Sequence, residues 1–177
     1  MRPSGRVAVV GGGPAGLMAA EVLAAGGASV DVFDAMPSVG RKFLLAGRGG
    51  LNLTHSEATG SLLARYGDRR ADLAAAIEAF DGPAVRDWAA GLGIETFVGT
   101  SGRVFPTGMK AAPLLRAWLR RLRESGVTLH ARHRWTGWTE AGALSFRTPD
   151  GEATHGADAV VLALGGASWS RLGSDGA

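Results

Sequence analysis

Residues 7–16 read Val-Ala-Val-Val-Gly-Gly-Gly-Pro-Ala-Gly, a short apolar run that leads into glycines spaced as Gly-x-Gly-x-x-Gly. An alanine-rich apolar segment follows, and then a second strand-like run that ends on Asp34. Dinucleotide-binding units have this order of elements: a strand, a tight turn, a helix, a second strand and an acidic residue. In this pattern Gly11 permits the turn, Gly13 lets the backbone approach a pyrophosphate, and Gly16 lets the helix lie close to the strand.

Two further features of this stretch favour a bound dinucleotide. The helix after Gly13 presents free N–H groups and a partial positive charge to phosphates, and Pro14 and Ala15 form its first turn. Asp34, followed by Ala35, lies 18 positions after Gly16, close to the spacing of about 20 at which a carboxylate accepts from ribose hydroxyls. The triplet alone does not separate FAD from NAD, and a glycine-rich turn without a ligand is the alternative interpretation.

Composition narrows the class of protein. The chain has 177 residues, of which 46% are hydrophobic, which is enough for one domain with a sizeable core and argues against disorder. It has no cysteine, which excludes disulfides, thiolate metal sites and iron–sulfur clusters. No apolar run reaches about 18 residues. We therefore expect a cytoplasmic protein with no membrane partner.

The distribution of charge argues against a nucleic-acid partner. The net charge is +3, from 19 basic and 16 acidic residues that are interspersed. A nucleic-acid interface needs a one-sided basic patch, whereas the densest arginine cluster, 116–123, fits the solvated face of an amphipathic helix. We expect a small-molecule substrate instead, and the sequence leaves the oligomeric state open.

The apolar pattern predicts an α/β fold with a parallel sheet. The expected segments are a βαβ unit over 6–34, a cofactor loop over 36–67, a helical insertion over 71–92 and a loop over 94–109. An amphipathic helix over 111–124, a strand and an antiparallel meander that ends at 148, and a buried strand over 159–164 are expected next. The unbroken apolar run of this last strand predicts cover on both faces. NAD-binding Rossmann domains seldom insert a meander before the next parallel strand, whereas two-dinucleotide-binding flavoprotein domains often do, so the order favours FAD.

The loop over 41–56 is the second dense motif, and it mixes cations, glycines, and hydroxyl or amide side chains. Glycines let backbone N–H groups converge on an anion, and the cations add charge. A flexible surface loop explains the same composition equally well.

Four motifs together resemble the BaiN-like bacterial flavoproteins, within the group of aminoacetone-oxidase-family FAD-binding or NAD(P)/FAD-dependent oxidoreductases. They are GGGPAG at 11–16, GRKFLLAGRGGLNLTHSE at 40–57, GRVFP with MKA within 102–111, and ALGGASW with GSDGA within 163–177. The resemblance implies a Rossmann-like two-dinucleotide-binding FAD domain interrupted by a substrate domain. It also implies an oxidoreductase whose FAD is reduced by NAD(P)H or by a small organic substrate.

The resemblance assigns further residues to the cofactor. Those along the pyrophosphate, ribitol and flavin would be Arg41, Lys42, Gly47, Asn52, Leu53 and Thr54, and those packed near the pyrophosphate would be Ala163, Gly165 and Gly166. Many family members read Arg-Cys-Asn where this chain has Gly50-Leu51-Asn52, so no thiol-assisted step is expected. Asp34 stands where glutamate is frequent, one methylene shorter.

Catalytic side chains are not evident, and no metal site is expected. The isoalloxazine carries the redox chemistry in flavoenzymes, so this does not argue against an enzyme. The candidates are His55, in the cofactor-like loop, and Arg103 and Lys110, which would face the flavin or a carboxylate substrate or else anchor a loop. His130 and His133, three positions apart, are expected on opposite faces of an extended strand.

Family members continue past the last residue of this chain. We therefore expect an N-terminal portion of an FAD domain, without the substrate domain, in which the apolar faces of the strand at 159–164 and of the meander stay partly exposed. We expect it to retain FAD weakly or not at all, not to turn over alone, and to tend to oligomerise. Two other functions compete with the oxidoreductase: a flavin-binding structural or regulatory module without turnover, and a nucleic-acid-associated protein that uses its arginines.

Overall fold

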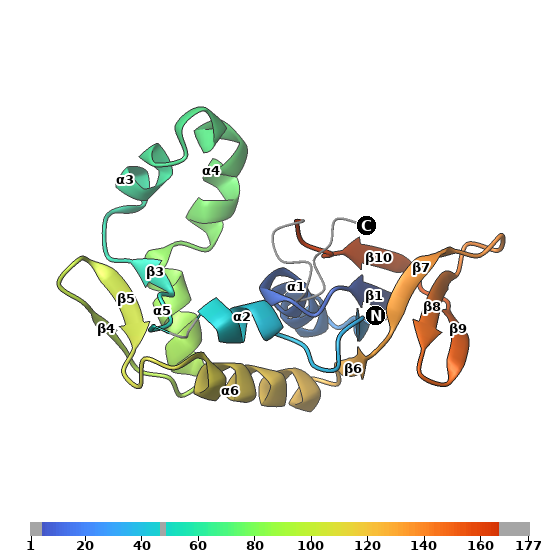
Figure 1. The fold of residues 1–177 in the computed structure, drawn as a ribbon. Coiled ribbons are helices and arrows are strands. Elements are labelled where there is room, and N and C mark those ends of the chain that lie inside the picture. The colour runs from blue at the N-terminus through green and yellow to red at the C-terminus, as the bar shows by residue number, and fades with distance from the viewer. Residues whose placement is uncertain (1–4, 47–48, 167–177) are drawn as a thin grey trace. The chain divides into compact units, whose positions relative to one another are not determined.

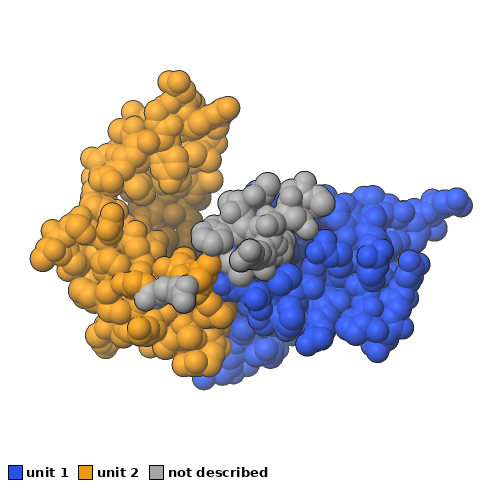
Figure 2. Space-filling view, in the orientation of Figure 1, with its two compact units in different colours: residues 1–43, 119–177 blue, residues 44–118 orange. Residues whose placement is uncertain are grey.

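The computed structural model describes residues 5–46 and 49–166 (Figure 1). The chain divides into two compact units, which Figure 2 distinguishes by colour. Unit 1 contains Met1–Phe43 and Leu119–Ala177, and unit 2 contains Leu44–Trp118. Each unit has its own sheet, so the two are described separately.

A four-stranded parallel sheet, in the order β10-β1-β2-β6, forms the centre of unit 1. Its strands are β1 (Arg6–Val10), β2 (Ser29–Asp34), β6 (Thr128–Ala131) and β10 (Ala159–Leu162). The chain adds β2 and β6 on one side of β1 and then returns to place β10 on the other side. The strand order therefore reverses between β1 and β10, and open α/β sheets bind ligands beyond the carboxyl ends of their strands at such a point.

Different elements cover the two faces of this sheet. Helix α1 (Pro14–Ala25) packs on one face, close to Val9. On the other face, Val10 and Phe33 belong to one buried cluster with residues of an antiparallel meander. The meander consists of β7 (Arg134–Trp138), β8 (Leu144–Thr148) and β9 (Gly151–His155). The predicted Rossmann-like α/β class, with a parallel sheet and a small meander, is confirmed.

The amphipathic helix predicted over 111–124 is α6 (Ala111–Glu124). Its apolar side chains at helical spacing, including Leu115, Trp118 and Leu122, are buried, and Arg121 forms an ion pair with Glu21 of α1 at 2.8 Å. At 14 residues it is the longest helix of the described chain. None of the helices in that part is both long and apolar enough to cross a membrane.

Unit 2 combines short helices with a three-stranded antiparallel sheet in the order β3-β5-β4. Asp81 is the N-cap of the helix over Gly82–Gly91, since its carboxylate accepts from Ala84 N at 3.0 Å. The same carboxylate also accepts from Thr59 Oγ1 at 3.1 Å. The elements from the boundary onward are α2 (Arg41–Ala46), β3 (Thr54–His55), α3 (Thr59–Ala64), the 3-10 turn η1 (Gly67–Arg69), α4 (Arg70–Ala79), α5 (Gly82–Gly91), β4 (Thr96–Val98) and β5 (Arg103–Pro106).

Two segments predicted as loops contain regular structure. The cofactor loop of 36–67 includes α2, β3 and α3, and the loop of 94–109 includes β4 and β5. These strands have two to four residues, too few for an alternation of apolar and polar residues to be recognised. The meander also continues to residue 155, beyond the predicted limit of 148.

The strand predicted over 159–164 is shorter and more exposed than expected. It ends at Leu162, and within the described residues it forms an edge of the sheet beside β1. Val160 and Val161 are half-buried, whereas Leu162 is 50% exposed. The prediction of a central strand covered on both faces is therefore wrong for these residues, whereas the prediction that this strand stays partly exposed in the chain agrees with them. Apolar composition indicates a strand, but the neighbours of that strand are decided by the tertiary structure.

Candidate dinucleotide site

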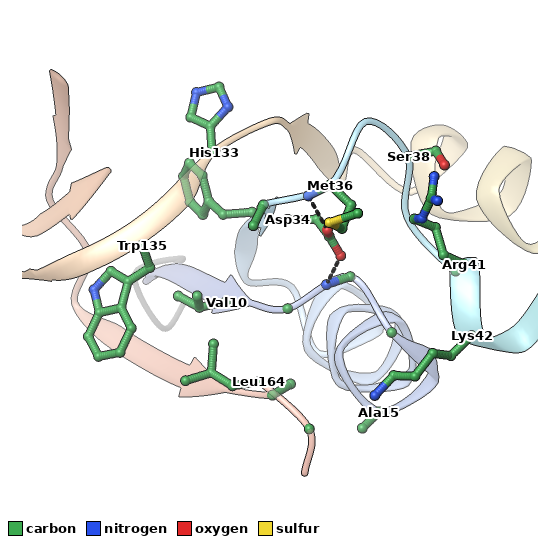
Figure 3. A pocket seen from close by; sticks show the side chains of 18 of the residues that line it. Val10, Ala15, Asp34, Met36, Ser38, Arg41, Lys42, His133, Trp135 and Leu164 are labelled. Carbon is green, nitrogen blue, oxygen red and sulfur yellow. Dashed lines mark hydrogen bonds between the residues drawn. The ribbon is translucent and has the colours of Figure 1, made fainter. Parts of the chain in front are cut away.

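A pocket of about 370 Å³ opens in unit 1 beyond the carboxyl ends of its parallel strands (Figure 3). It thus lies at the reversal of strand order between β1 and β10. Its walls are the glycine turn after β1 and the start of α1, the segment after β2, the first residues of α2, the segment 133–135, and residues 163–165 after β10.

The glycine turn packs directly against the end of β10. Gly11 has φ +111°, and a Cβ at this position would lie 2.2 Å from the carbonyl oxygen of Ala163. Gly11 N donates to Phe33 O at 2.8 Å, and Ala163 N donates to Val10 O at 2.7 Å. The backbone conformation and the close approach both require glycine at position 11.

Gly16 and Gly13 differ in what surrounds them. A Cβ on Gly16 would lie 1.9 Å from Gly11 O and 3.2 Å from Val9 Cγ1, so α1 approaches the strand as predicted. Gly13 precedes α1 with φ −79°, and a Cβ there would meet no described atom within 4 Å. Packing within the chain therefore explains glycine at 16 but not at 13, where the space opens into the pocket.

Asp34, at the end of β2, is held by two backbone amides. Its Oδ2 accepts from Gly12 N and its Oδ1 accepts from Met36 N, both at 2.8 Å. Figure 3 shows both hydrogen bonds at the wall of the pocket. A carboxylate oxygen accepts more than one hydrogen bond, so this carboxylate retains acceptor capacity for a ligand while its position is fixed.

Two cations line the same pocket from the start of α2. The side chain of Lys42 extends toward Ala15 in the first turn of α1, whereas the guanidinium of Arg41 lies by Ser38 (Figure 3). Arg41 Nε is buried and has no hydrogen-bond partner in the described structure. Free amides at a helix start and an adjacent ammonium group favour an anion.

An aromatic cluster backs the pocket beside Phe33, which lines it. Phe33 stacks with His130 at 4.6 Å and with Phe146 at 4.3 Å between ring centroids. His133 also lines the pocket, and its ring lies 5.3 Å from that of His130. The prediction that these two histidines occupy opposite faces is wrong, because Arg132 between them has φ +59° and interrupts the extended strand.

Histidines of this cluster share one carboxylate. His130 Nε2 lies 2.7 Å from Asp31 Oδ1, and His155 Nε2 lies 3.5 Å from Asp31 Oδ2. Burial lowers the pKa of His155, and the nearby His130 and Arg6 act in the same direction against the opposing effect of Asp31. The cluster thus favours a neutral ring for His155, the last residue of the meander.

Several residues assigned by the resemblance lie elsewhere. Asn52, Leu53 and Thr54 belong to unit 2, Gly47 lies outside the described residues, and Gly166 follows the pocket-lining residues Ala163 and Gly165. Their roles stay predictions.

The catalytic candidates all lie in unit 2. His55 Nδ1 accepts from Glu57 N at 3.1 Å, so its Nε2 donates to Ser101 O at 3.0 Å. The ring therefore joins β3 to the turn before β5, which is a structural role. Arg103 and Lys110 are exposed. The described geometry gives none of the three a chemical task.

Sequence reasoning missed part of the pocket wall. Gly12, the middle one of three consecutive glycines, lines the pocket, although the Gly-x-Gly-x-x-Gly spacing assigns no role to it. The segment 133–135 follows β6 directly, so the rule that ligands bind beyond the carboxyl ends of parallel strands would have pointed to it. The missed lining residues are Val10, Gly12, Phe33, Met36, Ser38, Gly40, His133, Arg134, Trp135 and Leu164.

Solved structures share this fold at low sequence identity. Thermovibrio ammonificans THI4 is 19% identical, with a TM-score of 0.58, over 91% of this chain and 57% of that chain. The 3-ketosteroid-delta4-(5alpha)-dehydrogenase of Rhodococcus jostii RHA1 is 17% identical, with a TM-score of 0.63, over 90% of this chain and 45% of that one. BexE, described for oxidation during BE-7585A biosynthesis, is 21% identical, with a TM-score of 0.56, over 96% of this chain and 33% of its own.

The chain thus spans between a third and somewhat more than half of these structures. No curated protein matches it. The sequence profile of the HI0933-like protein Rossmann domain matches residues 5–177, nearly the whole chain. The chain therefore belongs to the HI0933-like Rossmann domain family.

Proposed function

We propose that this chain carries the adenosine-diphosphate half of an FAD site in an FAD-dependent oxidoreductase. The observation that carries the proposal is the convergence of the Gly11–Gly16 turn, the fixed Asp34 carboxylate and the Lys42 ammonium on one pocket at the strand-order reversal. These groups match two parts of the ligand in chemistry: backbone amides and a cation for the phosphates, and a carboxylate acceptor for the ribose hydroxyls.

The roles of individual residues follow from this assignment. The amides at the start of α1 and Lys42 would hold the pyrophosphate, and the open space at Gly13 would let it approach the backbone. Asp34 would accept from the adenosine ribose. Bound FAD would supply the redox chemistry, and the chain would bind and orient it.

FAD is proposed over NAD because of the order of elements. A meander separates β6 from β10, as in two-dinucleotide-binding flavoprotein domains. Similar structures include a dehydrogenase and a protein described for oxidation, which agrees with redox chemistry. The electron donor would be NAD(P)H or a small organic substrate, and a BaiN-like specificity belongs to the same proposal.

Identification of the bound nucleotide tests this proposal. The protein is purified, denatured, and the released cofactor is identified by absorbance and chromatography. Apoprotein is then titrated with ADP, FAD and FMN, of which FMN lacks the adenosine half. We expect ADP to compete with FAD, and FMN to bind far more weakly. Release of NAD, or equal binding of FMN and FAD, would contradict the proposal. FAD that binds but is not reduced by NAD(P)H or substrate, even when the implied substrate domain is present, would indicate a flavin-binding module.

A further inference from the structure

Gly12 makes three contacts that the dinucleotide motif does not require of it. Its N–H donates to Asp34 Oδ2 and its carbonyl oxygen accepts from Gly40 N, both at 2.8 Å. A Cβ on Gly12 would lie 2.4 Å from Val39 Cγ1 and 2.8 Å from Asp34 Oδ2. One residue of the glycine turn therefore contacts both ends of the segment that follows β2.

We call residues 36–40 the strap. Its first residue, Met36, donates its N–H to Asp34 Oδ1 at 2.8 Å and accepts from Arg132 N at 3.0 Å. Near its end, Val39 is buried at 8% exposure against Gly12. The chain leaves the strap directly into α2, where Lys42 lines the pocket. The position of the strap therefore determines the position of the Lys42 backbone.

We infer that Gly12 is a positioning residue, which holds the strap against the glycine turn and thereby places the Lys42 ammonium for the ligand's phosphates. The inference rests on the proposed function. It joins two parts of the site that the sequence presents as separate, the ribose acceptor Asp34 and the phosphate cation Lys42, through one glycine.

The physical reason lies in the length of the lysine side chain. Its ammonium is a point charge at the end of a flexible four-carbon side chain. The ammonium contributes more to binding when the backbone of the lysine is already fixed, because less conformational entropy is then lost on binding. An alanine at position 12 pushes Val39 away and releases the Gly40 contact. Lys42 then retains its charge but loses its fixed origin.

A double-mutant cycle with two ligands tests this inference. Gly12→Ala, Lys42→Ala and the double variant of the 177-residue chain are titrated with ADP and with adenosine, which lacks phosphates. We expect each single variant to weaken ADP binding by about tenfold, the scale of one charge-assisted hydrogen bond. In the Gly12→Ala background, the further loss from Lys42→Ala should be less than about twofold, because the two changes remove the same interaction.

The readout is the ratio of ADP affinity to adenosine affinity, which we expect to fall in Gly12→Ala. General damage to the fold would weaken the binding of both ligands alike. The control is Gly156→Ala, a glycine of unit 1 where a Cβ meets no described atom within 4 Å, and it should leave ADP affinity unchanged. If Gly12→Ala does not fold, Val39→Ala enters the same cycle, because it loosens the strap and keeps Gly12.

The outcomes separate the inference from the proposed function. Independent, multiplicative losses for the two substitutions would overturn the positioning role of Gly12 while leaving the nucleotide site in place. Equal losses for ADP and adenosine in Gly12→Ala would overturn it too, since the strap would then act on the nucleoside rather than on the phosphates. A wild-type chain that binds neither ligand would contradict the proposed function itself, and the inference with it.

Discussion

Replacement of Asp34 by alanine is the most direct test of the ribose assignment. Asp34 accepts from Gly12 N and Met36 N at 2.8 Å each, and it is half-buried at the pocket wall. Asp34→Ala leaves two backbone donors that water reaches only in part, so we expect a loss of about 1–2 kcal/mol in the free energy of unfolding.

The same substitution has a separate effect on binding. A hydrogen bond from a ribose hydroxyl to a carboxylate is worth about 1.5–3 kcal/mol, so ADP affinity should fall by about 10- to 150-fold. Titration of apoprotein by calorimetry measures this loss, and urea unfolding measures the stability change. Stability and affinity are thus obtained from one set of variants.

Asp31 provides a matched control for Asp34. It lies on the same strand and is also half-buried, but its carboxylate contacts His130 at 2.7 Å and it does not line the pocket. Asp31→Ala should therefore lower stability and leave ADP affinity within about twofold of wild type. If both variants bind ADP equally well, Asp34 has no direct role in ribose binding.

Three further predictions concern the turn, the histidine cluster and α5. Gly16→Ala should lower the free energy of unfolding by about 1–3 kcal/mol or prevent folding, because the new Cβ would lie 1.9 Å from Gly11 O. Gly13→Ala should leave unfolding by urea nearly unchanged and weaken ADP binding, and a stability loss as large as that of Gly16→Ala would contradict this account. Because burial lowers the pKa of His155 from 6.5, its neutral ring contributes stability that is fully present above that value and is lost as pH falls toward the folded pKa. Urea unfolding between about pH 5.5 and 7.5 should therefore show a steeper fall at acid pH in wild type than in His155→Gln, and parallel curves would refute it. Asp81→Ala should cost about 1 kcal/mol of unfolding free energy through loss of the α5 N-cap; Asp81→Asn, which retains an acceptor, should cost less, and equal losses would argue against capping.

Local chain chemistry was sufficient to predict several of the regular elements. The first βαβ unit and the α6 helix were predicted within a residue, because Pro14 at a helix start, glycines at turns and apolar spacing act over a few neighbouring residues. Short strands such as β3, with two residues, escaped prediction, because their existence depends on a partner strand. The reversal at Arg132 also escaped, since a non-glycine residue at φ +59° has no clear local signal.

The sequence by itself determined the glycine turn, its helix and the acid after the second strand, since those requirements lie within about 30 residues of each other. Only the tertiary structure decided what faces that turn. The packing of Gly11, where an added Cβ would lie 2.2 Å from the carbonyl oxygen of Ala163, depends on which strands become neighbours. So does the contact of Asp31 with His130, 99 positions away. Neighbours and register follow from burying both faces of the sheet together, and no local pattern encodes that choice. The hydrogen bond between Gly12 and Gly40 of the strap is also decided by the tertiary structure, because it forms only when β1 and β2 lie side by side.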